Sequence, residues 1–142
     1  MKIIIKNLQK KIQIRPKEVR STVLKVLSSE KKKADIAEIT VCFVTDRIIK
    51  SLNSRFLGIG LPTDVISFSM NDQSDSKRVV ADIAISVDTV KRNALTFGVS
   101  LRRESERILI HGLLHLAGYD DRKAGQIKRM RQKEDQYLKI RR

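Results

Sequence analysis

The chain has 142 residues, of which 41% are hydrophobic and 4% aromatic, which is enough for one globular domain with a core. Lysine and arginine number 30 against 16 acidic residues, and the formal net charge of +14 favours phosphate-rich partners, nucleic acid before anionic membrane. The single cysteine excludes an internal disulfide framework and a cysteine-based zinc ribbon, and no apolar run approaches a membrane span. We expect a soluble, cytoplasmic protein with a single domain over residues 1–142.

The first half of the chain alternates between strand and helix patterns. Residues 2–6 (KIIIK) predict a strand, and the apolar positions within 16–27 follow a helical period. Residues 38–45 are rich in β-branched side chains and alternate apolar with polar positions, which predicts a second strand. Asp46 can cap a short helix, which Gly58 then ends. This half therefore predicts the order βαβα.

The second half begins with two strands and continues as helices. Residues 64–70 (DVISFSM) alternate large and small side chains, and 79–87 (VVADIAISV) are expected to pair with them as an antiparallel strand. The remaining periodic segments are 88–97, 101–117 and a basic helix that follows. The complete order, βαβαββααα, predicts an α+β fold in which three consecutive helices cover a small mixed sheet.

Both histidines of the chain lie in the segment HGLLHLAGYDD, four residues apart. On a helix this spacing corresponds to about 40° of rotation and about 6 Å of rise, so His111 and His115 can face one ion. The helix should end at Gly118, and either Asp120 or Asp121 can then cap the next helix or reach back toward the imidazoles. The residues alone leave two interpretations open. One is a metal site with a carboxylate ligand, and the other is a pair of packed histidines.

Gly112 excludes one class of metal enzyme. The zinc-protease motif places a glutamate, its general base, immediately after the first histidine of the pair. Glycine occupies that position here, so the segment does not carry a zinc-protease motif.

Several segments together resemble the YbeY-type rRNA maturation factors, which are bacterial endoribonucleases. HGLLHLAGYDD resembles the family signature HGxLHLxGYDH, and LNSRFLGIGLPTDVISF (52–68) is similar to its LNxxYRxxxxPTDVLSF. ADIAISVDTVKRNA (81–94) resembles a third family segment, and Met130 and Leu138 fall where the family tends to have Met and Leu. The resemblance covers roughly residues 38–138.

The resemblance implies an α+β domain and a metal-dependent endoribonuclease that cuts single-stranded RNA. The family acts in maturation of the 16S rRNA 3′ end and in ribosome quality control, and its metal, usually zinc, is held by three histidines. By position, His111 and His115 supply the first two ligands. We therefore expect one divalent ion per chain, with zinc favoured, and the small ribosomal subunit as partner. The oligomeric state stays undetermined.

Two positions depart from the family pattern. Asp121 replaces the third histidine, and we predict that it still coordinates, which gives a His₂Asp site with a wider choice of metals. Leu57 replaces an arginine that the family commonly has after the aromatic at Phe56. Arg55 is two residues away and points to a different side of a helix. These departures are expected to weaken catalysis more than the fold.

The reaction is expected to use a metal-activated water or a ribose 2′-OH, and no side-chain base is assigned. Glu134 lies on a predicted helical stripe with apolar neighbours, where we expect it to lie at the edge of the stripe and reach solvent.

RNA binding should depend on charge, because aromatic side chains are few. The candidates for phosphate contacts are Arg55, Lys91, Arg92, Arg102 and Arg103.

Three other residues are expected to have structural roles. Asp120 is expected to cap the final helix rather than to bind metal. Pro62 fixes the entry to the strand that follows, and Asp64 forms a hydrogen bond with the turn backbone.

The alternative function is a non-catalytic, ribosome-associated RNA-binding factor with a structural metal or none. A membrane-surface role is disfavoured, since no segment combines a basic face with a bulky aromatic one.

Overall fold

The computed structural model describes residues 1–32, 35–58, 60, 63–71 and 78–139 of the chain, so the predicted role of Pro62 lies outside the described residues. Within these ranges the elements follow the predicted order βαβαββααα. Their bounds are β1 Lys2–Asn7, α1 Pro16–Ser29, β2 Ile36–Val44, α2 Asp46–Leu57, β3 Val65–Asn71, β4 Val79–Ser86, α3 Val87–Phe97, α4 Leu101–Leu116 and α5 Ala124–Leu138. The α+β prediction is confirmed.

The four strands form one mixed sheet in the order β1-β2-β4-β3. β2 pairs in parallel with both β1 and β4, and its Val41 lies between Ile5 and Ile83 in the register. β3 and β4 pair antiparallel, as the sequence predicts, and the register places Val65 opposite Ile85. β3 is therefore an edge strand, and its first residues lie beside the end of β4.

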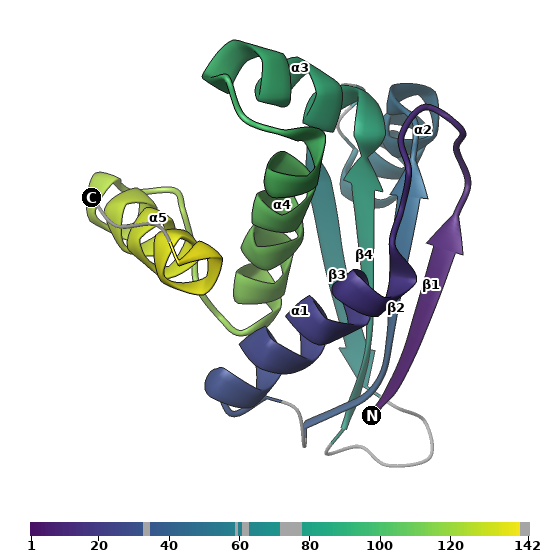
Figure 1. The fold of residues 1–142 in the computed structure, drawn as a ribbon. Helices are drawn as coiled ribbons and strands as arrows, with labels where there is room; N and C mark the ends of the chain where they lie inside the picture. The colour runs from purple at the N-terminus through teal and green to yellow at the C-terminus, as the bar shows by residue number, and fades with distance from the viewer. Residues whose placement is uncertain (33–34, 59, 61–62, 72–77, 140–142) are drawn as a thin grey trace.

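One face of the sheet carries the main core, in which Ile39, Val41 and Phe43 alternate inward from β2 and are buried. α1 and α4 pack on this face, and α5 packs on α4 as an outer layer (Figure 1). The expectation that three consecutive helices cover the sheet therefore needs correction. α1, from the first half of the chain, shares the inner layer with α4, while α5 buries its apolar stripe largely against α4.

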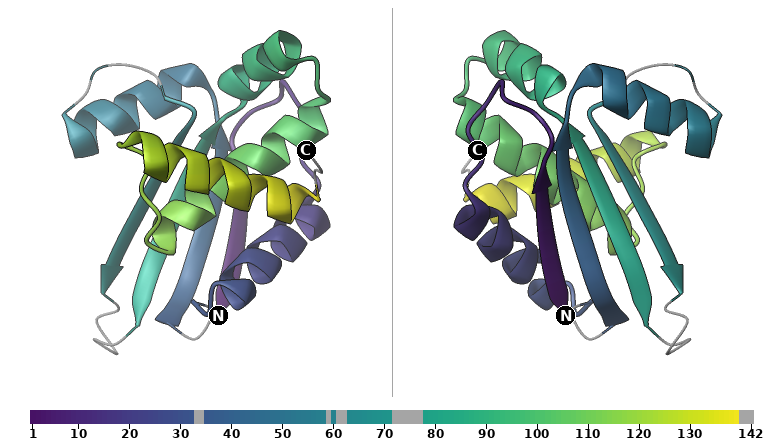
Figure 2. Two further views of the ribbon diagram at one scale, coloured as in Figure 1. Left: turned by 90° about the vertical axis from the view of Figure 1, so that its left-hand side faces the viewer. Right: turned by 90° about the vertical axis from the view of Figure 1, so that its right-hand side faces the viewer.

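The opposite face of the sheet is covered at one end by α2 (Figure 2, right). A second, smaller core forms there around Val44, Ile49, Ile66 and Ala84. α2 begins with Thr45 at its N-cap position, so the prediction that Asp46 caps this helix is wrong. The backbone N–H of Asp46 instead donates to the Asp88 carboxylate at 2.7 Å. The local sequence pattern could not predict this hydrogen bond, because Asp88 belongs to a different helix, α3.

α4 lies very close to the sheet because Gly112 faces β3 and β4. A Cβ at this position would approach the Val65 Cγ2 atom to 3.0 Å and the Ser67 Oγ atom to 3.2 Å. The Ser67 hydroxyl also donates to the Gly112 carbonyl at 3.0 Å. α4 ends at Leu116, and Gly118 follows with a φ of +101°, so the predicted stop at that glycine is confirmed. The close contact fixes the helical turns that carry both histidines beside the edge strand.

Across the described ranges, no helix combines the length and the apolar character needed to cross a membrane.

Candidate metal centre

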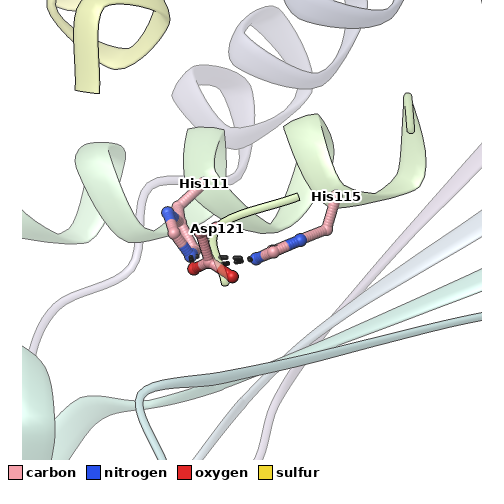
Figure 3. A group of neighbouring side chains, drawn as sticks. All are labelled: His111, His115 and Asp121. Atoms are coloured by element: carbon pink, nitrogen blue, oxygen red, sulfur yellow. Dashed lines mark hydrogen bonds and ion pairs between the residues drawn. The ribbon is translucent and has the colours of Figure 1, made fainter. Parts of the chain in front are cut away.

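The structure brings together the three side chains that the sequence predicts as metal ligands. His111 and His115 project from the same side of α4, and Asp121 approaches them from the segment that follows the helix (Figure 3). One ligand atom of each residue lies within 4.8 Å of the other two. The two Nε2 atoms are 3.0 Å apart, and the Asp121 Oδ2 atom lies 3.2 Å from His111 Nε2 and 3.5 Å from His115 Nε2.

The orientation of His115 is set by a backbone carbonyl. Its Nδ1 atom lies 3.1 Å from the Tyr119 carbonyl oxygen. A carbonyl can only accept, so Nδ1 carries the proton and donates it. In the neutral imidazole the Nε2 atom then presents its lone pair toward His111 and Asp121.

The orientation of His111 is set by a carboxylate. Its Nδ1 atom lies 2.8 Å from the Glu134 Oε2 atom on α5. The other Glu134 oxygen accepts a hydrogen bond from Arg107 at 3.2 Å. Carboxylate oxygens accept, so Nδ1 of His111 is the donor. The Nε2 atom of a neutral His111 therefore also presents a lone pair toward the same point.

Three lone pairs thus converge on one small volume, an arrangement that a bound cation would stabilise. Zinc–nitrogen bonds of about 2.0–2.1 Å in tetrahedral geometry place neighbouring ligands about 3.3 Å apart, close to the observed separations. Two imidazoles held through Nδ1, together with one carboxylate, form a donor set suited to zinc, manganese or iron(II). The residues present therefore fit a catalytic type of metal site with a position left for substrate or water.

A proton can take the place of the metal. Burial opposes a charge on His111, but the hydrogen bond and charge of Glu134, with the charges of Asp64 and Asp121, raise the pKa of His111 above its ordinary value. The same negative surroundings stabilise a bound cation. The electrostatics of the site therefore favour one positive charge between the imidazoles.

A buried network of charges supports the His111 side of the site. Arg107 bridges Glu104 and Glu134, whose exposed fractions are only 2% and 5%. Hydrogen bonding to Glu104, partly opposed by burial, raises the pKa of Arg107, so its guanidinium remains charged. Asn93 on α3 completes the network by donating to Glu104 at 3.0 Å.

The expectation that Glu134 reaches solvent is wrong. Glu134 lies on the buried face of α5, where Arg107 and His111 satisfy both of its oxygens. Sequence reasoning missed this role, although one signal was present. Arg107 lies four residues before His111 on α4, so the helix presents a cation and an imidazole side by side to a carboxylate on a neighbouring apolar stripe.

Asp120 does not cap the last helix, so that expectation is also wrong. The N-cap position of α5 is Lys123, whose backbone N–H donates to the Gln126 side chain at 3.0 Å. Asp120 Oδ1 instead accepts from the Asp121 backbone N–H at 2.9 Å, and its other oxygen pairs with Arg122. Asp120 thereby shapes the turn that carries the third predicted ligand.

Asp64 has the structural role that the sequence predicts. Its Oδ1 atom accepts a hydrogen bond from the Val65 backbone N–H at 2.8 Å, at the start of β3. It also contributes negative potential at His111, which the sequence did not predict.

Four of the predicted RNA-binding residues lie toward the other end of α4 or on α3. Arg102 precedes His111 by nine residues, which is about 13 Å along a helix. Arg102 pairs with Glu18, Arg92 pairs with Asp46 at 2.7 Å, and Arg103 donates to a backbone carbonyl. Lys91 is exposed. Their contact with RNA stays a prediction, although two of the arginines already have acidic partners.

Arg55 belongs to a different basic surface, on α2. A shallow hollow on this helix is lined by Arg47, Lys50, Ser51, Ser54, Arg55 and Gly60. Within the described ranges no acidic side chain forms an ion pair with any of its three cations. Leu57, two residues further on, is 53% exposed, so the position where the family commonly has arginine presents an apolar side chain to solvent.

Comparison with known proteins agrees with the resemblance seen in the motifs. A family model described as "Endoribonuclease YbeY" matches residues 4–141. Proteins named "Endoribonuclease YbeY" from Desulforamulus reducens and Chloroherpeton thalassium are each 37% identical over 97% of this chain and cover 95% and 94% of their own lengths. The solution structure of TM1509 from Thermotoga maritima matches 97% of this chain and 87% of its own, with 27% identity and a TM-score of 0.64.

Proposed function

The chain belongs to the YbeY endoribonuclease family, and from that premise we propose that it is a metal-dependent nuclease that cuts single-stranded RNA. The observation that carries this proposal is the convergence of the two Nε2 atoms and the Asp121 oxygen, with both Nδ1 atoms held from behind. The natural substrate we propose is the precursor of the 16S rRNA 3′ end, on the small ribosomal subunit. Ribosome quality control and a cytoplasmic location belong to the same proposal.

We propose His111, His115 and Asp121 as the ligands of one divalent ion, with zinc favoured. When bound there, the ion supplies a Lewis acid for the scissile phosphate and a means of activating water. The aspartate adds a negative charge that a histidine would not. It therefore favours a harder cation, such as manganese, more than a three-histidine site does.

Other residues of the chain orient the predicted ligands or offer contacts to the RNA. Glu134 and the Tyr119 carbonyl hold the two imidazoles, and Arg107 holds the Glu134 carboxylate in place by a hydrogen bond. The cations of α2, which have no acidic partner among the described residues, offer contacts to the RNA backbone. Since aromatic side chains are few, binding is expected to depend on salt concentration more than on base stacking.

The test is an RNA cleavage assay with untagged protein, because a polyhistidine tag would bind metal. We expect cleavage of single-stranded RNA, little cleavage of duplex RNA, loss of activity in chelator, and recovery when zinc or manganese is added. His115→Ala, purified in parallel, controls for contaminating nucleases and should be inactive. Wild-type protein that binds metal and RNA but shows no chelator-sensitive cleavage would support the alternative of a non-catalytic ribosome-associated factor.

A further inference from the structure

The segment between α4 and α5 serves the metal centre twice. The Tyr119 carbonyl accepts from His115 Nδ1, and Asp121, two residues later, supplies the carboxylate. Any movement of Tyr119 therefore changes the orientation of one predicted ligand and the position of another. Whatever anchors Tyr119 also anchors this half of the site.

Tyr119 is anchored by a residue that precedes it by 89 positions in the chain. Its hydroxyl donates to Glu30 Oε1 at 2.7 Å, and Glu30 is the residue directly after α1. The side chain of Glu30 is only 10% exposed. Its other oxygen accepts from the Tyr137 hydroxyl and pairs with Lys133 Nζ at 3.3 Å, both on α5. The Glu30 carboxylate thus joins the end of α1 to α5 and to the segment between α4 and α5 that carries Tyr119 and Asp121.

The charge of Glu30 is maintained by these neighbours. Burial would raise the pKa of the carboxyl, but hydrogen bonds from Tyr137 and Tyr119, together with Lys133, lower it overall. The Tyr119 ring is held as well, since the Arg129 guanidinium and the Lys133 ammonium lie 5.7 and 5.8 Å from its centroid. The ring contacts would survive loss of the hydroxyl, so the Glu30 link can be tested by itself.

We propose that Glu30, acting through the Tyr119 hydroxyl, is a positioning residue for the metal centre. It fixes the Tyr119 carbonyl, which in turn fixes the tautomer and ring orientation of His115 and holds Asp121 within reach. The inference rests on the proposed function, since it concerns binding at the same site. It adds a residue that precedes the first histidine by 81 positions and touches no ligand.

The chain offers a matched pair of variants. Tyr119→Phe and Tyr137→Phe each remove one hydroxyl donor from the same carboxylate, but only residue 119 carries the carbonyl that holds His115. If Glu30 and the side chains that bind it only stabilise the fold, the two changes should have equal effects on metal affinity. A positioning role predicts that only Tyr119→Phe weakens binding.

The experiment measures the zinc affinity of untagged full-length protein by competition with a chromophoric chelator, and records the visible spectrum of the cobalt(II) form. We expect Tyr119→Phe and Glu30→Gln to weaken zinc binding about tenfold and to alter the cobalt spectrum, whereas Tyr137→Phe stays within about twofold of wild type. Thermal unfolding of the metal-free variants shows whether both tyrosine changes cost similar stability.

Wild-type and Tyr119→Phe proteins with equal zinc affinity and identical cobalt spectra would overturn this inference and leave the proposed function intact. Equal weakening by Tyr119→Phe and Tyr137→Phe would also overturn it, because the effect would then belong to the cluster as a whole. Wild-type protein that binds neither metal would overturn the proposed function together with the inference.

Discussion

The His111 Nδ1 atom lies 2.8 Å from the Glu134 carboxylate, although the two residues are 23 positions apart and belong to different helices. This contact fixes which nitrogen of His111 faces His115 and Asp121 at the candidate metal centre. The two oxygens of Glu134 have separate tasks, since one accepts from His111 and the other from Arg107. Both tasks require an acceptor, which makes the residue sensitive to a conservative change.

Glu134→Gln should lower zinc affinity by roughly 10- to 100-fold, the usual effect of removing a hydrogen-bond acceptor from a metal-binding histidine. Whichever way the amide is turned, its NH₂ group faces a donor, either Nδ1 of His111 or the Arg107 guanidinium. Chelator competition measures the loss. Gln132→Ala, exposed on the same helix, is the control and should bind zinc as wild type does. A Glu134→Gln protein with wild-type affinity would show that the contact does not support the site.

Asp121→His should tighten zinc binding and reduce the preference for manganese, because an imidazole is a softer ligand than a carboxylate. Asp121→Ala should lower the metal content of the purified protein, since only two ligands remain. Inductively coupled plasma mass spectrometry on untagged protein, after incubation with each metal, gives both results. An unchanged zinc-to-manganese ratio in Asp121→His, or full occupancy in Asp121→Ala, would exclude the aspartate as a ligand.

Metal-free protein should gain stability from His111 at low pH. Because the folded pKa of His111 is raised above the unfolded value of about 6.5, this contribution is fully present below pH 6.5 and is lost as pH rises through the folded pKa. Zinc should reverse the trend, since protons compete for Nε2. Thermal unfolding between about pH 5.5 and 8, with chelator or zinc, tests the sign. The difference between wild type and His111→Gln isolates the contribution, and a metal-free wild type that gains stability over the variant with rising pH would contradict it.

Gly112→Ala should destabilise the fold by about 1–3 kcal/mol, because the new methyl group would crowd Val65, Ser67 and Ile83. The free energy of unfolding in denaturant is the appropriate measurement. Gly125→Ala is the matched control, since nothing lies within 4 Å of a Cβ there and alanine favours a helix. Equal stability of the two variants would mean that α4 can move away from the sheet at no cost.

Removing charge from α2 should weaken RNA binding more than removing it from α3 and α4. Lys50→Gln with Arg55→Gln removes two cations without acidic partners in the described structure, whereas Arg92→Gln with Arg102→Gln removes two that already pair with carboxylates. Filter binding of a single-stranded RNA at several salt concentrations should show a shallower salt dependence for the first variant, by about one unit for each phosphate that the protein no longer neutralises. The reverse order would assign the RNA path to α3 and the start of α4.

Sequence patterns predicted the elements well because the signals for each are local. The alternation of Ile39, Val41 and Phe43 with less apolar residues identifies β2, and the glycine at position 118 identifies the end of α4. The spacing of the histidines was also local, so the candidate ligands could be named. The residues that support them could not, since Glu30 and Glu134 meet the site only after α1 and α5 pack around α4.

Two of the wrong predictions, those for Asp46 and Glu134, have a common physical origin. Asp46, Asp120 and Glu134 were each assigned to the nearest local task, a helix cap or a solvent-facing position. In the folded chain Asp46 binds Ser86 and Arg92, and Glu134 binds across helices. These two carboxylates take donors that the tertiary structure brings close, whereas Asp120 binds its sequence neighbours Asp121 and Arg122.

The two supports of the candidate metal centre come from opposite sides of the histidines in the chain. Glu30 precedes both histidines, whereas Glu134 follows them in α5, the last helix. The Glu30 carboxylate also binds Tyr137 and Lys133 of α5, so both supports depend on that helix. A chain that ends before α5 should therefore hold zinc more weakly than the full-length protein, because it lacks the acceptor for His111 and two of the partners of Glu30.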